Sequence, residues 1–304
     1  MLDILLNLLA LMAAGWLACK LKLVDEHSEK VINDLVYLIG LPALLFSKIA
    51  AAHLGADMLP FVFSNALAVG IMVLLPFLAF KLGWLSSKHA ALLILGAGFG
   101  NIGFMGLPVI QMKWGSDALA PAGLLIAVHS LVVFAAGLWL IAHMQKGPKA
   151  GASWTDGLHN PLVLSTLAGL AWSFIGLPLP GPVSYALDSL GSLSIILSLF
   201  SMGLFFATHR LGQHLAGSIC LSAAKLLVLP ALAILALWAL HPAGPLAQLT
   251  LLEALMPVGV ANYVLARRLK LDHALAAEAI LLSTLLSLPL LLGFDVLAKA
   301  VLGA

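Results

Sequence analysis

Residues 98–110, GFGNIGFMGLPVI, combine four glycines, an asparagine and a proline inside an apolar segment. Proline removes a backbone donor and clashes with the preceding turn, while glycine tolerates an unwound backbone. Each backbone group freed in this way costs about 2–7 kcal/mol when it is buried without a partner. Such a break persists among apolar residues only if protein buries it or if it lines a water-filled cavity. We therefore predict that Asn101, Gly103 and Pro108 line a ligand site.

A second stretch with the same character is MPVGVANYV, residues 256–264, which places Pro257 close to Asn262. Two interrupted helices would each present an N-terminus carrying roughly half a positive charge, which favours an anionic ligand. The two asparagine side chains would bond either the freed backbone or the ligand. The alternative is structural: the glycines permit tight helix packing and the prolines only kink the chain.

Five further polar residues lie inside apolar segments and are candidates for a supporting role. Lys225 would balance an anionic substrate or place its ammonium in a cation site, unless it is a structural tether. His129 would carry a proton or be a satisfied core histidine. Glu253 would bind a proton or sodium near Pro257, or it would lie close enough to the membrane interface to be solvated. Ser47 and Ser201 would touch the ligand, or simply bond a preceding carbonyl.

Composition indicates that these residues are positioned by helices in a membrane. The chain has 304 residues, of which 62% are hydrophobic and only 9% charged, whereas soluble proteins carry about 25% charged residues. A membrane-spanning helix needs roughly 20 apolar residues, and the sequence predicts ten such spans. They cover residues 3–19, 31–52, 60–80, 89–112, 117–144, 159–177, 183–207, 216–240, 246–267 and 273–298.

Several function classes are disfavoured by what the sequence contains. The two cysteines, Cys19 and Cys220, indicate neither a disulfide framework nor a metal site. A net charge of +2 is too small to suggest a nucleic-acid partner. We find no HExxH or GxSxG motif, so we expect no enzyme, no metal and no cofactor. The apolar N-terminal run, which no basic residue precedes, is expected to be a first span and not a cleaved signal peptide.

The distribution of Lys and Arg predicts the orientation. Eleven of the fifteen lie in odd-numbered connections, three lie in even-numbered connections or at the ends, and Lys225 lies within a span. Because basic residues gather on the cytoplasmic side, we expect a multi-pass protein of the cytoplasmic membrane with both termini on the extracytoplasmic side.

An internal repeat appears when the sequence is shifted by 154 residues. LPFLAFKLGW (75–84) then aligns with LPALAILALW (229–238), and LFS at 45–47 aligns with LFS at 199–201. Each half would hold five spans, and an odd number turns the second half upside down relative to the first. We therefore predict two inverted repeats, residues 1–146 and 155–304, a plan typical of secondary transporters whose sites lie in broken helices.

The chain resembles the auxin efflux carrier family, which includes bacterial malonate and malate permeases and is related to the bile-acid, arsenite and riboflavin transporters. The resemblance is carried by GNIGFMGLPVI in the fourth span, GLPALLF (40–46) in the second and MPVGVAN (256–262) in the ninth. It implies an all-α polytopic membrane protein of ten transmembrane helices with the sodium/proton antiporter-like fold. In that fold, broken helices 4 and 9 cross at the substrate site. The long cytoplasmic loop of the plant members is absent, which makes auxin an unexpected substrate.

The function that this resemblance and the paired breaks predict is secondary active transport of a small organic anion by alternating access. The substrate would be a carboxylate or dicarboxylate, similar to auxin, malonate or malate. The alternatives are a passive facilitator or uniporter of weak acids, and a sodium-coupled symporter of the bile-acid type. The partners are then the anion, membrane lipid and, as coupling ion, a proton or sodium, while a homodimer is left open.

Overall fold

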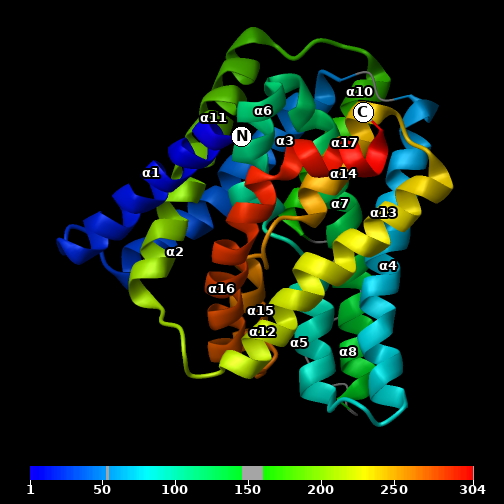
Figure 1. The fold of residues 1–304 in the computed structure, drawn as a ribbon. Coiled ribbons are helices and arrows are strands. Elements are labelled where there is room, and N and C mark those ends of the chain that lie inside the picture. Colours follow the sequence, from blue (N-terminus) through cyan, green and yellow to red (C-terminus); the bar gives the residue numbers. More distant parts are fainter. Residues whose placement is uncertain (53–54, 146–159, 304) are drawn as a thin grey trace. The chain divides into compact units, whose positions relative to one another are not determined.

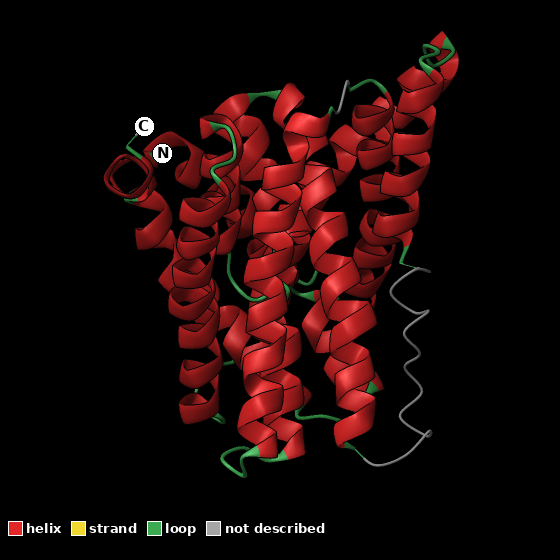
Figure 2. Cartoon of the chain, turned by 90° about the vertical axis from the view of Figure 1, so that its right-hand side faces the viewer, coloured by secondary structure: helices red, strands yellow, loops and turns green. Residues whose placement is uncertain are grey.

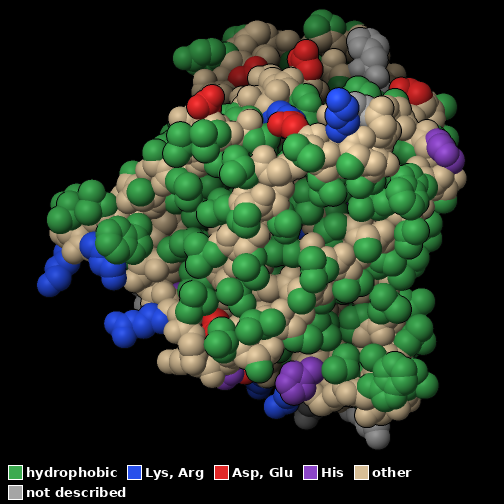
Figure 3. Space-filling view, in the orientation of Figure 1, with side chains coloured by type: hydrophobic (Ala, Val, Ile, Leu, Met, Phe, Trp, Pro, Cys, Tyr) green, Lys and Arg blue, Asp and Glu red, His purple; other side chains and the backbone are tan. Residues whose placement is uncertain are grey.

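The computed structural model describes residues 1–52, 55–145 and 160–303, and within these ranges the chain is helical with no strand (Figure 2). Among the described residues, seven helices are long and apolar enough to cross a membrane, and Pro161–Ile175 is a shorter apolar helix. The seven are Leu2–Lys20, His27–Ala50, Ala56–Lys81, Ser116–Met144, Gly181–Thr208, Leu215–Leu240 and His273–Leu292. Hydrophobic side chains cover most of the face drawn in Figure 3, as expected for a surface in contact with lipid.

The chain forms two compact units, and each takes segments from both halves of the sequence. Unit 1 comprises Met1–Ala56, Ile102–Ala127 and Asn160–Arg210, and unit 2 comprises Asp57–Asn101, Val128–His159 and Leu211–Ala304. The expected boundary between the sequence repeats, between residues 146 and 155, lies outside the described residues.

Unit 1 is held together by close helix packing. Helix α1 packs along α11, and α10 packs along α3. A Cβ atom on Gly15 would overlap the carbonyl oxygen of Phe200, and one on Gly203 would overlap that of Met12. Glycine at these two positions therefore lets the backbones of α1 and α11 approach closely, as small residues do between membrane helices. The elements are α1 (Leu2–Lys20), α2 (Glu26–Leu35), η1 (Val36–Gly40), α3 (Leu41–Ala50), η3 (Ile102–Gly106), α6 (Leu107–Trp114), η4 (Ser116–Ala118), α10 (Pro161–Ile175) and α11 (Gly181–Thr208).

Unit 2 is also built from packed helices. Helices α4 and α13 lie side by side, as do α12 and α16 (Figure 1). The elements are α4 (Leu59–Lys81), α5 (Ser87–Gly98), η5 (Val132–Gly137), α8 (Leu138–Met144), α12 (Leu215–Ala223), η6 (Ala224–Val228), α13 (Leu229–Leu240), α14 (Gly244–Ala254), α15 (Ala261–Arg268), α16 (His273–Leu292) and α17 (Phe294–Leu302). Two elements fall at unit boundaries: η2 (Ala56–Met58) begins at one, and α7 (Leu119–Leu131) crosses another.

Two predicted spans are interrupted. In 89–112, α5 ends at Gly98 and the next helical residue is Ile102, while in 246–267 α14 ends at Ala254 and α15 begins at Ala261. The prediction for the last span, 273–298, was too long. Helix α16 ends at Leu292, and Gly293 separates it from α17, which carries Asp295 and Lys299.

Candidate functional site

The two interruptions meet within unit 2. The backbone N–H of Asn101 donates to the carbonyl oxygen of Pro257 at 2.8 Å, and the N–H of Gly259 donates to the carbonyl oxygen of Phe99 at 3.2 Å. These bonds make a short antiparallel pair centred on Gly100 and Val258. Each unwound segment thus provides hydrogen-bond partners for backbone groups of the other. A broken helix needs such partners where no water is present to bond its free N–H and C=O groups.

Glycine is required where the two segments approach. A Cβ on Gly259 would lie 2.8 Å from the carbonyl oxygen of Gly100. A Cβ on Gly100 would lie 2.9 Å from Cε of Lys225 and 3.0 Å from Oε1 of Glu253. The absence of a side chain at Gly100 therefore leaves room for two buried polar side chains beside the crossing.

Asn101 and Asn262 are both buried at this crossing, each with 2% of its surface exposed. The Asn262 side chain donates from Nδ2 to the carbonyl oxygen of Phe99 at 3.0 Å. Its Oδ1 atom has no hydrogen-bond partner among the described residues. The sequence left open whether these asparagines bond backbone or ligand, and the nitrogen of Asn262 bonds backbone while its oxygen is uncommitted.

A buried polar cluster lies beside the crossing in unit 2, where Lys225 and Glu253 approach Gly100. Its members, each at most 2% exposed, are Lys225, Glu253, His129, Asn65 and Thr250. Nζ of Lys225 donates to the carbonyl oxygen of Ala254 at 2.9 Å. Nε2 of His129 lies 3.4 Å from Oδ1 of Asn65, and Nδ2 of Asn65 donates to Oγ1 of Thr250 at 2.9 Å.

The contact between His129 and Glu253 is close but poorly aligned. Nδ1 of His129 lies 3.4 Å from Oε1 of Glu253, yet the two atoms do not form a hydrogen bond, and neither atom has another partner among the described residues. The distance alone would suggest an ion pair, but we give more weight to the missing alignment, because hydrogen bonds weaken steeply away from linearity. The three titratable residues identified from sequence are thus brought together on one side of the crossing.

Two other candidates, Gly103 and Pro108, lie in unit 1. The sequence suggested that Pro108 would mark the interruption, but it lies in α6, which continues directly from η3, and the backbone at Gly106 is still helical. The interruption lies at residues 99–101 instead, followed by the π-helical segment η3, which contains Gly103. A carbonyl in this segment, that of Phe104, accepts a hydrogen bond from Ser198 at 2.9 Å.

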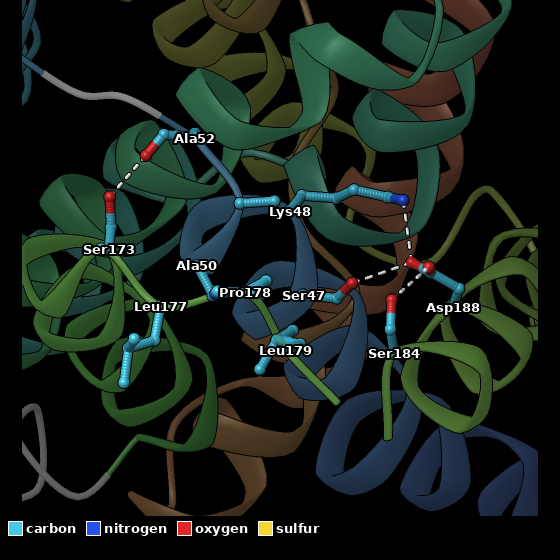
Figure 4. A pocket seen from close by; sticks show the side chains of 12 residues that line it. Ser47, Lys48, Ala50, Ala52, Ser173, Leu177, Pro178, Leu179, Ser184 and Asp188 are labelled. Carbon is cyan, nitrogen blue, oxygen red and sulfur yellow. Dashed lines mark hydrogen bonds and ion pairs between the residues drawn. The ribbon is translucent and has the colours of Figure 1, made fainter. Parts of the chain in front are cut away.

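A cavity of about 490 Å³ in unit 1 contains a second polar cluster, which is drawn in Figure 4. Lys48, Ser47 and Ser184 all point toward the carboxylate of Asp188. Nζ of Lys48 and Oγ of Ser47 each donate to its Oδ1 at 2.8 Å, and Oγ of Ser184 lies 3.4 Å from Oδ2. The other repeat-paired serine, Ser201, donates to Oδ1 of Asn33 in the same unit.

Sequence reasoning missed the pairing of Lys48 with Asp188. Neither residue is among the site candidates that the sequence identifies. Each charge interrupts an otherwise apolar helix, which was the available signal, but only the fold brings together residues that are 140 positions apart. Within the described ranges no group of three or more His, Cys, Asp or Glu could hold a metal ion.

Comparison with known proteins assigns the chain to a family. The family model described as "Membrane transport protein" matches residues 1–153 and 149–294. An "Uncharacterized transporter" of Methanothermobacter thermautotrophicus is 26% identical over 94% of this chain and 94% of that protein. A "Putative malonate transporter" of Rhizobium meliloti is 25% identical over 98% and 96%, and "Auxin efflux carrier component 3a" of rice is 26% identical over 47% and 24%. Together with its apolar helices, these matches show that the chain is a multi-pass membrane transporter that belongs to the auxin efflux carrier family.

Proposed function

We propose that this chain is a secondary transporter that moves a small carboxylate or dicarboxylate across the cytoplasmic membrane by alternating access. The crossing of the two interrupted segments in unit 2 would be the substrate site. One observation carries this proposal: two broken helices complete each other's backbone bonding through Asn101–Pro257 and Gly259–Phe99, rather than being repaired within themselves. Such breaks persist at membrane depth where protein buries them or where they line a cavity, and in secondary transporters they form the substrate site.

The chemistry at the crossing suits an anionic ligand. The first turn of α15 follows the second interruption, so its N-terminal backbone groups contribute a positive potential there. Lys225 adds a full positive charge nearby, partly balanced by Glu253. A relative of similar length carries the name malonate transporter, and malonate is a dicarboxylate, so dicarboxylates are the first substrates to test.

The topology in this proposal is that of ten spans in two inverted five-span repeats, residues 1–146 and 155–304, with both termini extracytoplasmic. In this topology the seven long apolar helices of the described residues, the shorter one and the two interrupted segments would each cross the membrane once. The division into two compact units supports a mechanism in which one bundle moves relative to the other.

Uptake into proteoliposomes tests the proposal. The purified protein would be assayed with labelled malonate, malate and a monocarboxylate, with proton and sodium gradients imposed separately. We expect saturable uptake and counterflow of one of these acids, which a passive pore would not give. Asn101→Ala should lower the rate at least tenfold, by analogy with other buried polar contacts to a ligand, while Asn7→Ala on the exposed face of α1 should not. Equal rates for Asn101→Ala and the wild type would show that the crossing is not the site.

A further inference from the structure

The ammonium group of Lys225 has an environment of the kind that transporters of this architecture offer to a metal cation. It lies fully buried in η6 and donates to the carbonyl oxygen of Ala254, the last residue of α14. The free carbonyls at the end of a helix carry about half a negative charge. In broken-helix transporters, such helix ends and unwound carbonyls coordinate the coupling sodium ion or proton.

A carboxylate lies close to this environment without bonding the ammonium. Oε1 of Glu253 and Nζ of Lys225 lie 3.0 and 3.1 Å from the same point, the position that a Cβ would take at Gly100. Oε1 has no hydrogen-bond partner among the described residues. The ammonium therefore bonds one carbonyl at the end of a half-helix, and an unbonded carboxylate oxygen lies near it beside Gly100.

The charge balance excludes a second cation beside this lysine. Within the described residues, Glu253 and His129 are the titratable groups that interact electrostatically with Lys225. A sodium ion added here would place two cations against one carboxylate in a medium with little screening, where like charges repel strongly. Asn65 and Thr250, which lie behind His129, bring no further negative charge.

We propose that the ammonium of Lys225 is a resident substitute for a coupling cation, so that transport needs no sodium. Removal of the ammonium would expose a site that accepts sodium or lithium. The transport part of this inference rests on the function proposed above, whereas cation binding by the variant does not. The inference argues against the sodium-coupled symporter that the sequence left as an alternative.

Three variants test this. Lys225→Ala removes the ammonium and leaves its space, Lys225→Met removes the charge but fills the space, and Lys225→Ala combined with Glu253→Gln removes both charges. Lys81→Ala, at the end of α4, is the control for loss of a lysine elsewhere. Each protein would be purified and melted in sodium, lithium and choline chloride at equal ionic strength.

We expect sodium to raise the melting temperature of Lys225→Ala by about 2–4 °C over choline, as a ligand present in excess of its dissociation constant does. The wild type, Lys225→Met, the double variant and Lys81→Ala should melt at the same temperature in both salts. If Lys225→Ala is recovered as a folded protein only when purified in sodium or lithium, that also supports the inference. No difference between salts, or no recovery in any of them, overturns it.

Transport gives the second readout. Wild-type uptake should be equal in sodium and choline, and Lys225→Ala should transport at about one tenth of that rate or less in choline and recover severalfold in sodium. A wild type that requires sodium overturns the inference while leaving the proposed function intact. A wild type that moves no carboxylate overturns the proposed function, and the melting experiment then decides the inference alone.

Discussion

A single methyl group at Gly259 would test whether the antiparallel crossing is essential. In Gly259→Ala the added Cβ would lie 2.8 Å from the carbonyl oxygen of Gly100 and 3.2 Å from that of Phe99. Both neighbours are backbone atoms, which cannot rotate away as a flexible side chain does. The two segments must therefore separate, which lengthens or breaks the hydrogen bonds that join them.

The expected loss follows from the two bonds involved. Each contributes about 0.5–1.5 kcal/mol, and a buried donor left without a partner costs about 1–3 kcal/mol. Because both bonds lie in the same short pair, we expect Gly259→Ala to lower the free energy of unfolding by about 2–4 kcal/mol. Transport should fall with it, since the same separation displaces Asn262 from the carbonyl of Phe99.

Gly70→Ala is the matched control, because it makes the same chemical change in α4 of the same unit with no atom within 4 Å of the new Cβ. That substitution should stabilise the helix by about 0.5–1 kcal/mol. The assay is thermal unfolding in detergent together with uptake of the transported acid. If Gly259→Ala melts and transports like Gly70→Ala, the close approach in the structure is not a requirement, and the reasoning about the crossing is wrong.

Three further predictions concern the rest of the structure. Asn262→Asp, which keeps the shape but adds a buried negative charge, should reduce uptake of an anion more than Asn262→Ala does, as measured by initial rates; the reverse order would argue against an anionic substrate. Asp188→Asn should change the free energy of unfolding by less than about 1 kcal/mol, because the side chains of Lys48 and Asp188 are 26% and 40% exposed, and a larger drop in melting temperature would contradict this. Gly203→Ala should destabilise by about 1–3 kcal/mol or more, because the new methyl would overlap the backbone of α1. Gly181→Ala, in the same helix with open space around it, should be recovered from size-exclusion chromatography at wild-type yield.

The interruptions could be predicted because their residue types are visible in the sequence. Glycine, asparagine and proline within an apolar run signal a break at any point of GFGNIGFMGLPVI, yet they do not fix its position. Pro108 suggested a break near itself, but the chain stays helical through this position, from η3 into α6. Residues 99–101 were unwound instead, because this is the segment that finds backbone partners in residues 257–259.

The candidate site could be predicted only as a set of separate residues. Lys225, Glu253 and His129 are each polar groups in apolar helices, and each also has an interpretation that involves no ligand. They lie on η6, α14 and α7, and no periodicity within a helix relates residues on three different helices. Their convergence depends on packing between helices and on Gly100, whose missing side chain makes room for two of them.

The described residues include four π-helical segments, η1, η3, η5 and η6, each set within or next to an apolar helix. A π turn accommodates one residue more than an α turn, so it behaves like a single-residue insertion that the helix has absorbed. Since one residue corresponds to about 100° of rotation in an α-helix, deleting Ala224 and restoring regular winding in η6 would rotate one side of the helix against the other. The residues of α12 and those that follow from Lys225 could then no longer keep their present faces together. The exact number of residues in these helices thus determines which side chains face the crossing, just as the identity of each side chain there does.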